Sequence, residues 1–251
     1  MKKFVIQILE KFLKIKILNL KARENFSRYS VLKNFFLRIN STELNKNKKF
    51  IVFDVGSNLG KEAKKYEEIL IKCNFDYEFH IFEPNLHLIN SIKAQNIKNV
   101  KINQLIVGNK FGKSILKIES NSEKSSVNNK IFNTNIIEEL TVNNETIDGY
   151  VEKNNIKNIN FIKIDTEGLN EEVIEGAKNS LEKGIIDLVL TELTLGKKYE
   201  NKSEKIYNIE KYLNKNYALI GIDNQYILHF NSILFNRSFN IDLLYINKKF
   251  L

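Results

Sequence analysis

Short apolar runs that alternate with helical segments are the feature that most limits the folds open to this chain. The run Phe50–Val55 is apolar and rich in β-branched residues, as is typical of a strand buried on both faces of a sheet. Strands are expected at 50–55, 77–82, 100–106, 159–164 and 185–190, and helices at 61–72, 86–95, 171–181 and 203–213. This order predicts an α/β fold with a doubly wound, mostly parallel sheet.

Two regions fall outside this alternation. Apolar runs at 217–222 and 226–235 flank a turn at Asp223-Asn224, which predicts a C-terminal antiparallel hairpin. Residues 108–135 are rich in Ser, Asn and Lys and less regular, with another hairpin expected around Phe111-Gly112.

Residues 1–48 are expected to form a helical N-terminal extension, and residues 49–251 the α/β domain. Between Phe4 and Ile17 apolar residues recur at helical spacing, with lysines among them. Charges interrupt this run well before the ~20 apolar residues that a transmembrane helix needs, and no cleavage site of a signal peptide follows. The extension is expected to pack on the domain, to act as a lid or to contact a second subunit in a homodimer. The alternative is weak peripheral contact with an anionic membrane surface.

The net charge of +9 raises the question of a nucleic-acid partner. Only four of the 39 basic residues are arginine, the side chain best suited to bidentate contacts with guanine and phosphate. The lysines are scattered among Asn and Ile, as an AT-rich coding sequence would produce. We therefore expect no nucleic acid, and at most a preference for an anionic substrate such as a sugar nucleotide. The single cysteine is compatible with the reducing cytoplasm, where we expect the protein.

The expected turn after the first strand carries the first motif, FDVGSNLG at residues 53–60. Asp54 ends the strand, and Gly56 and Gly60 bracket the turn. Glycines there allow positive φ angles and a close approach of the backbone to a ligand. The dinucleotide fingerprint Gly-x-Gly-x-x-Gly is incomplete because Asn58 holds its middle position. The motif therefore favours a cofactor without a pyrophosphate.

The second motif, Phe82-Glu83-Pro84-Asn85, follows the second strand. An acid at the end of that strand can accept hydrogen bonds from both hydroxyls of a ribose, so Glu83 and the first motif together indicate an adenosyl ligand. The residues expected to bind this cofactor are Asp54, Gly56, Ser57, Asn58, Gly60, Glu83, Pro84 and Gly108.

Two more acidic motifs end the fourth and fifth strands. Asp165 lies in KIDTEG at residues 163–168, and Glu192 lies between Thr191 and Leu193. Ligands of open α/β sheets bind at the carboxyl ends of the strands, so both acids are expected to face one crevice. Three interpretations stay open. The carboxylates hold a hard divalent cation, one of them is a general base with a pKa raised by its neighbour, or Asp165 or Thr166 caps the following helix.

The ordered motifs resemble the FkbM family of methyltransferases. The resemblance covers about residues 50–193 and rests on FDVGSNLG, Phe-Glu-Pro, ETID at 145–148, IKIDTEG at 162–168 and EVIEGA at 172–177. It implies a Rossmann-like class I methyltransferase fold, S-adenosylmethionine as the methyl donor, and O-methylation, often of sugars in bacterial surface polysaccharides or natural products.

The resemblance also implies roles for individual residues. Asp54, Gly56, Asn58 and Gly60 would line the amino-acid end of the donor, Glu83 would hold its ribose, and Asp165, Glu167 and Glu192 would face the transfer site. The family usually has a second glutamate soon after Asp-x-Glu-Gly, whereas this chain has Asn170. Residues 1–48 and 196–251 lie outside the resemblance and are expected to determine the acceptor.

The function that the resemblance implies is O-methylation of a sugar hydroxyl by S-adenosylmethionine. The acceptor would be a nucleotide-activated sugar, such as a heptose, or a sugar of a capsule or lipooligosaccharide. A divalent Fe, Mn or Mg ion held by Asp165 and Glu192 would activate the hydroxyl, and Glu167 would be a third ligand or the base. His229 is a weaker candidate for a ligand, with a structural role as the alternative. The alternatives from other classes are a nicotinamide-dependent oxidoreductase of related fold and a non-catalytic donor-binding protein.

Overall fold

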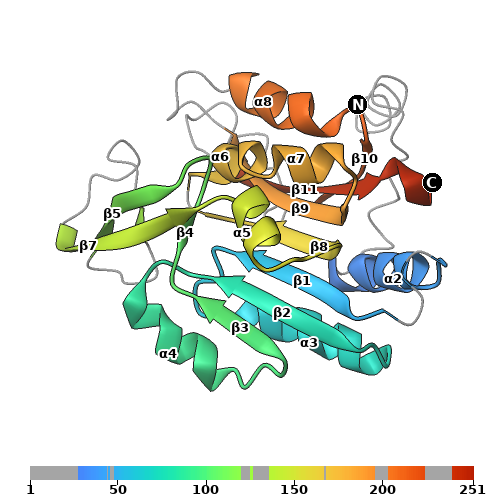
Figure 1. Cartoon of the computed structure of the whole chain (residues 1–251), viewed down its shortest axis with the longest axis horizontal. Coiled ribbons are helices and arrows are strands. Elements are labelled where there is room, and N and C mark those ends of the chain that lie inside the picture. The colour runs from blue at the N-terminus through green and yellow to red at the C-terminus, as the bar shows by residue number, and fades with distance from the viewer. Residues whose placement is uncertain are drawn as a thin grey trace, which may run out of the picture.

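The computed structural model describes residues 28–43, 45, 48–119, 125–126, 136–166, 168–195, 203–223 and 239–251. In this part of the chain a central seven-stranded sheet has the order β10-β11-β9-β8-β1-β2-β3. Helices cover both of its faces, as Figure 1 shows. The predicted α/β fold with a doubly wound, mostly parallel sheet is confirmed.

The central sheet and its helices have the following bounds. The strands are β1 (Phe50–Val55), β2 (Tyr77–Phe82), β3 (Val100–Asn103), β8 (Ile159–Ile164), β9 (Ile186–Leu195), β10 (Tyr217–Asp223) and β11 (Phe239–Asn247). The helices are α2 (Arg28–Asn40), α3 (Lys61–Lys72), α4 (Leu86–Ala94), α5 (Ile147–Lys153), α6 (Asn170–Glu175), α7 (Lys178–Glu182), α8 (Ser203–Leu213) and the 3-10 turn η2 (Lys248–Phe250).

The order of the strands reverses beside β1. From β1 the chain passes to β2 and β3 on one side, and it later returns to β8 and β9 on the other, with all four pairings parallel. In an open α/β sheet the crevice outside the carboxyl ends at such a reversal is where ligands bind. The fold therefore directs attention to the ends of β1, β2 and β8.

The far edge of the sheet is antiparallel. Strand β11 lies between β9 and β10 and runs antiparallel to both, which confirms the predicted antiparallel close of the sheet. Residues 226–235, which we expected to form the second strand of this hairpin, lie outside the described residues. The strand that pairs with β10 is β11, which the sequence pattern did not predict.

Two apolar cores form on the two faces of the central sheet. On one face, side chains of α2, α3 and α4 pack against the sheet. On the other, side chains of α5, α6, α7 and α8 do so. The sheet strands are apolar on both faces because both faces are covered in this way.

Helix α2, which lies within the predicted N-terminal extension, packs directly on the domain. Its side chains Leu32, Phe36 and Ile39 are completely buried. The ring of Phe36 lies 5.0 Å from that of Phe50 and 5.1 Å from that of Phe161, so the helix closes the core over β1 and β8. The apolar segment between residues 4 and 17 lies outside the described residues.

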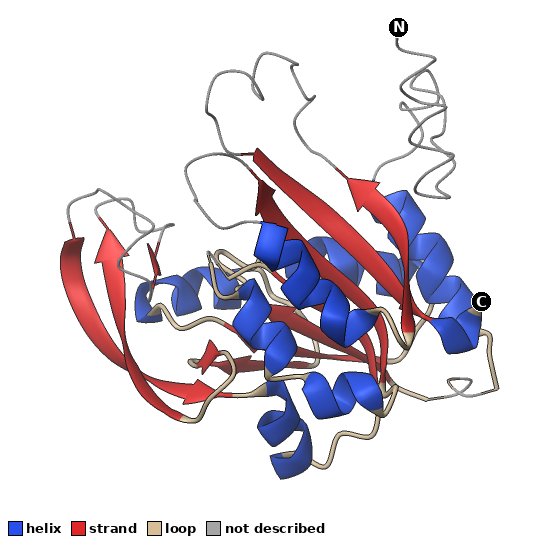
Figure 2. Ribbon diagram, turned by 90° about the horizontal axis from the view of Figure 1, so that it is seen from above, coloured by secondary structure: helices blue, strands red, loops and turns tan. Residues whose placement is uncertain are grey.

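A second, four-stranded sheet corrects two sequence expectations. It consists of β4 (Ile106–Val107), β7 (Ile136–Glu145), β5 (Gly112–Glu119) and β6 (Ser125–Ser126), in that order, and Figure 2 shows it to one side of the central sheet. The predicted strand 100–106 is wrong at its end, because Ile106 pairs with β7 and not with β2. The predicted hairpin at Phe111-Gly112 is also wrong, because β4 and β5 both pair with β7 rather than with each other.

The predicted helix 171–181 is two short helices, α6 and α7, separated at Gly176. The backbone N–H of Asp148 donates to the carbonyl of Gly176. The Asp148 carboxylate also accepts hydrogen bonds from the backbone N–H groups of Asn179 and Ser180, each at 2.8 Å. These contacts cap α7 from a distant segment, which local periodicity cannot reveal. Among the described helices, none is long and apolar enough to cross a membrane.

Candidate active site

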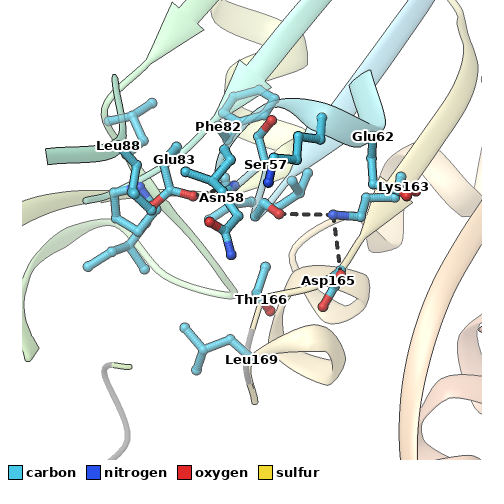
Figure 3. A pocket seen from close by; sticks show the side chains of 18 of the residues that line it. Ser57, Asn58, Glu62, Phe82, Glu83, Leu88, Lys163, Asp165, Thr166 and Leu169 are labelled. Carbon is cyan, nitrogen blue, oxygen red and sulfur yellow. Dashed lines mark hydrogen bonds and ion pairs between the residues drawn. The ribbon is translucent and has the colours of Figure 1, made fainter. Parts of the chain in front are cut away.

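A cavity of about 350 Å³ opens at the carboxyl ends of β1, β2 and β8 (Figure 3). Its walls come from the β1–α3 turn, the first turn of α3, the β2–α4 turn, the β8–α6 turn and the second sheet. A volume of this size lies within the range of small-molecule sites. The residues that line it are Val55, Gly56, Ser57, Asn58, Leu59, Lys61, Glu62, Lys65, Phe82, Glu83, Pro84, Leu88, Leu105, Ile106, Val107, Leu116, Lys163, Asp165, Thr166 and Leu169.

The turn between β1 and α3 forms the floor of the cavity. Gly56 has a φ of 75°, and a Cβ added to it would lie 1.9 Å from the backbone oxygen of Asp165. Only glycine fits there, because both the φ angle and the contact exclude a side chain. The next residues also bend sharply, since Asn58 has a φ of 54° and Gly60 a φ of 74°. Gly56 thus lets the turn after β1 approach the end of β8.

Asp54 supports this turn from below and does not line the cavity. Its side chain is fully buried, and its Oδ2 accepts a hydrogen bond from Ser57 Oγ at 2.6 Å. Its Oδ1 lies 3.4 Å from Lys163 Nζ. The side chain therefore supports the turn and does not reach the cavity.

Lys163 is a buried cation in the wall of the cavity, and sequence reasoning assigned no role to it. Its Nζ donates to the Gly56 carbonyl at 2.9 Å and lies 3.4 Å from a carboxylate oxygen of both Asp54 and Asp165. Burial alone would lower the pKa of Lys163, but the two carboxylates outweigh burial and raise this pKa above 10.5. A lysine inside a buried, mostly apolar strand was the sequence signal that could have pointed to this cluster.

Glu83 stands at the other end of the cavity. Its two carboxylate oxygens accept the backbone N–H groups of Asn58 at 2.8 Å and Asn85 at 2.9 Å. Burial raises the pKa of Glu83 to about 7, and the two N–H bonds only partly oppose this rise. Two acceptor positions remain on a carboxylate that uses two of its roughly four lone-pair sites.

Asp165 follows β8 and reaches the cavity, as Figure 3 shows. Its side chain is 38% exposed, far more than those of its neighbours in the ion cluster. Thr166 beside it is fixed by Asn170, whose Oδ1 accepts both the backbone N–H and the hydroxyl of Thr166, at 2.8 and 2.7 Å. Asn170 Nδ2 also donates to the carbonyl of Glu192 at 2.8 Å. The glutamate that the family usually has near this position could not make the bond to the Glu192 carbonyl, because an ionised carboxylate has no N–H donor.

The predicted acceptor and metal residues are only partly brought together. Asp165 lines the cavity, whereas the half-buried Glu192 does not. Glu167 and His229 lie outside the described residues. No group of three His, Cys, Asp or Glu side chains that could hold a metal ion occurs in the described part of the chain. The ammonium of Lys163 already lies beside Asp165, so these residues do not by themselves form a metal site.

The remaining predicted cofactor residues divide in the same way. Gly56, Ser57, Asn58, Glu83 and Pro84 line the cavity. Gly60 and Gly108 do not, although Gly60 begins α3. The cavity also has an apolar lining that no motif predicted, because it comes partly from the second sheet. Its members are Leu88, Leu105, Ile106, Val107, Leu116 and Leu169.

Glu62, in the first turn of α3, is a second cavity residue that sequence reasoning missed. Its carboxylate accepts hydrogen bonds from the hydroxyls of Tyr29 and Tyr66, at 2.6 and 2.8 Å, and pairs with Arg28. Burial alone would raise the pKa of Glu62, but Arg28 and the two hydroxyls lower it below 4.5. Arg28 and Tyr29 belong to α2, so no local pattern around Glu62 shows these contacts.

The chain is similar to one protein family and to several solved methyltransferase structures. The family model described as "Methyltransferase FkbM domain" matches residues 54–220. Among solved structures, a precorrin-6y C5,15-methyltransferase from Geobacter metallireducens is 8% identical, with 87% of this chain and 86% of that chain covered and a TM-score of 0.43. An SAM-dependent methyltransferase from Aquifex aeolicus is 11% identical, with 90% and 93% covered and a TM-score of 0.40. No curated protein sequence is significantly similar to the chain.

The family match covers the turn after β1, Glu83, Lys163 and Asp165, which are the elements that build the cavity. The match also covers β2, β3, β8 and β9 completely. It includes the last two residues of β1 and the first four of β10, and it does not include β11. The chain therefore belongs to the FkbM methyltransferase family and is an S-adenosylmethionine-dependent methyltransferase.

Proposed function

We propose that the protein transfers the methyl group of S-adenosylmethionine to a hydroxyl of a sugar, either nucleotide-activated or part of a bacterial surface polysaccharide. The observation that carries this proposal is the arrangement of one cavity. A carboxylate with free acceptor positions, Glu83, lies at one end, and the exposed carboxylate of Asp165 lies at the other. The first suits the ribose of the donor and the second suits a reacting hydroxyl.

The residues of the cavity fit the donor. Glu83 has two acceptor positions left for the two ribose hydroxyls. The apolar wall that includes Leu88, Leu105 and Leu116 offers a surface for the adenine ring. With the ribose at Glu83, the methionyl chain and its sulfonium extend along the β1–α3 turn toward Lys163 and Asp165. The β1–α3 turn has Asn58 in place of the middle glycine of the dinucleotide fingerprint, which favours a ligand without a pyrophosphate.

Methyl transfer from the sulfonium is an in-line displacement. The acceptor oxygen forms a bond to the methyl carbon while the bond from carbon to sulfur breaks, and sulfur keeps the electron pair as a neutral thioether. The hydroxyl proton must leave, and Asp165 is the carboxylate of the cavity that is exposed enough to receive it. Lys163 and the backbone contact of Gly56 hold Asp165 in place for this step. No metal ion is needed in this scheme.

Polar groups at the mouth of the cavity support a charged sugar as the acceptor. Lys61 and Lys65 lie along one edge of α3 and line the cavity, and both side chains are exposed. Two ammonium groups beside the site would attract the phosphates of a sugar nucleotide. The resemblance to a family that often methylates sugars supports the same class of acceptor.

The test is a direct assay of the full chain. The protein is incubated with S-adenosylmethionine and a panel of sugar nucleotides that includes heptose and deoxysugar derivatives, with and without a chelator. Formation of S-adenosylhomocysteine, together with a sugar nucleotide heavier by one methylene unit, is the expected result, and the chelator should not abolish it. If no sugar nucleotide is methylated, the same assay is run on capsule polysaccharide and lipooligosaccharide. Donor binding without methylation of any of these sugars would contradict the proposal, as would methylation confined to nitrogen or carbon acceptors.

A further inference from the structure

Glu62 has an unusual set of partners for a residue in the wall of a ligand cavity. Tyr29, Tyr66 and Arg28 all donate hydrogen bonds to its carboxylate. An ionised carboxylate offers about four acceptor positions, so one position is left after these three bonds. Because Glu62 lines the cavity, this position is available to a ligand.

The charges around Glu62 favour a positively charged ligand group. Arg28 is shared between Glu62 and Asp242, with 2.5 Å between Arg28 Nη1 and Asp242 Oδ2. Lys163 is likewise shared between two carboxylates, those of Asp54 and Asp165. Four carboxylates thus face two enclosed cations at this end of the cavity. Lys65 lies 3.8 Å from Glu62 and is more than half exposed, so this exposed ion pair is weak and only partly offsets the excess of carboxylates.

The position of Glu62 relative to Glu83 indicates which group of the donor it meets. Figure 3 shows Glu62, Lys163 and Asp165 on the side of the cavity away from Glu83. A donor whose ribose is held by Glu83 directs its amino-acid end toward that side. The α-ammonium of this end is a compact cation with three N–H donors, which matches one ionised carboxylate with a vacant acceptor position.

We infer that Glu62 binds the α-ammonium of S-adenosylmethionine and that Arg28 is a positioning residue for Glu62. This inference rests on the donor-binding part of the proposed function and not on the sugar acceptor. Arg28 and Asp242 both lie outside residues 54–220, the range of the family match. Helix α2 and strand β11, from the two ends of the chain, thus complete the amino-acid end of the donor site.

Pairs of ligands that differ only at the amino-acid end provide the test. S-adenosylhomocysteine and 5′-methylthioadenosine are both thioethers, and the second lacks the entire amino-acid end. S-adenosylmethionine and its decarboxylated form are both sulfonium ions, and the second keeps the ammonium but lacks the carboxylate. Binding of all four to the full chain is measured by titration calorimetry, for wild type and for Glu62→Gln.

Loss of one charge-assisted hydrogen bond should weaken binding of S-adenosylhomocysteine to Glu62→Gln by about 10- to 100-fold. Binding of both sulfonium ligands should weaken by a similar factor, because both keep the ammonium. Binding of 5′-methylthioadenosine should not change. Arg28→Gln should give the same pattern with a smaller factor, because Tyr29 and Tyr66 still hold Glu62.

Matched controls separate this role from a loss of structure. Glu68 is an exposed residue of α3, and Arg38 is an exposed residue of α2. Neither Glu68→Gln nor Arg38→Gln should change the affinity for any of the four ligands. Thermal unfolding of each variant shows whether it is folded. An equal loss of affinity for 5′-methylthioadenosine and S-adenosylhomocysteine would overturn the inference, as would unchanged binding of S-adenosylhomocysteine to folded Glu62→Gln. Failure of every sugar in the methylation assay would leave these binding results unaffected, so the two proposals can fail separately.

Discussion

The two ends of the cavity hold a glutamate each, and they hold it in different ways. Glu83 is bound by backbone N–H groups of residues near it in sequence or in the adjoining turn, and burial raises its pKa to about 7. Glu62 is bound by an arginine and two tyrosine hydroxyls, and its pKa is lowered. The glutamate at one end thus changes its protonation state near pH 7, whereas the glutamate at the other end stays ionised at that pH. Neutral dipoles offset the cost of burial less than a nearby cation does.

The difference suits the groups that we assign to each end. Ribose hydroxyls are neutral donors, and their arrival completes the hydrogen bonding of Glu83 in a closed pocket. An ammonium is charged, and a carboxylate that is already ionised binds it without first losing a proton. The end with Glu62 also contains Lys163 and Asp165, where we propose that the reacting groups meet. Variants of Asp165, Lys163 and Glu83 test this difference between the two ends.

The largest effect is expected from Asp165→Asn, which removes the proposed base at the ionised end. The value of kcat should fall by about 100- to 10,000-fold, the usual contribution of a general base. The affinity for S-adenosylhomocysteine should stay close to that of wild type, because Asp165 is assigned to the acceptor. Steady-state kinetics and calorimetry measure the two quantities. Asp76→Asn, an exposed aspartate before β2, is the matched control, and an unchanged kcat in Asp165→Asn would remove the assigned role.

The next effect concerns stability and comes from Lys163→Met. This change leaves the fully buried Asp54 without its cation. Loss of one partner from a buried ion pair should lower the free energy of unfolding by about 3–5 kcal/mol. Urea unfolding provides the measurement.

Two further variants show whether that loss comes from the buried charge. Asp54→Asn combined with Lys163→Met should restore part of the lost stability, because no unpaired carboxylate then remains. Lys157→Met, an exposed lysine in a loop, should be neutral. A Lys163→Met variant as stable as wild type would show that the cluster contributes little to the fold.

The smallest effect is a pH dependence from the Glu83 end. The pKa of Glu83 is near 7 in the free protein, and ribose hydroxyls that donate to the ionised form would lower it on binding. Affinity for S-adenosylhomocysteine should therefore fall as pH drops below 7, by up to about tenfold per unit. Binding at pH 6 should release a proton, which calorimetry in two buffers of different ionisation enthalpy detects. Glu83→Gln should bind more weakly and lose this pH dependence, whereas Glu62→Gln should keep it.

The stability of the free protein should respond to Glu83 with the opposite sign. Because the folded-state pKa lies above 4.5, the ionised side chain is the less favourable form in the folded protein. Its cost is fully present above pH 7 and disappears as pH falls toward 4.5. A wild type whose affinity and stability show no difference from Glu83→Gln between pH 5 and pH 8 would contradict this account of the ribose end.

The sequence alone determined the framework of the site. Strands β1, β2 and β8 coincide with the predicted runs, because strands covered on both faces must be apolar along their length. The turn at Gly56 and the acid at Glu83 were also readable, since both follow directly from a strand end. These features depend on residues close to each other in the chain.

Which of the other residues meet depends on long-range contacts in the folded chain. Lys163 forms an ion pair with Asp54 on a different strand. Glu62 pairs with Arg28 and accepts a hydrogen bond from Tyr29, both on α2. The pairing of β4 and β5 with β7 brings apolar side chains to the cavity from a region that showed no clear pattern. Periodicity reports which face of an element is buried, but not which distant element covers it. The long-range contacts that set the charge of the site were therefore settled by folding.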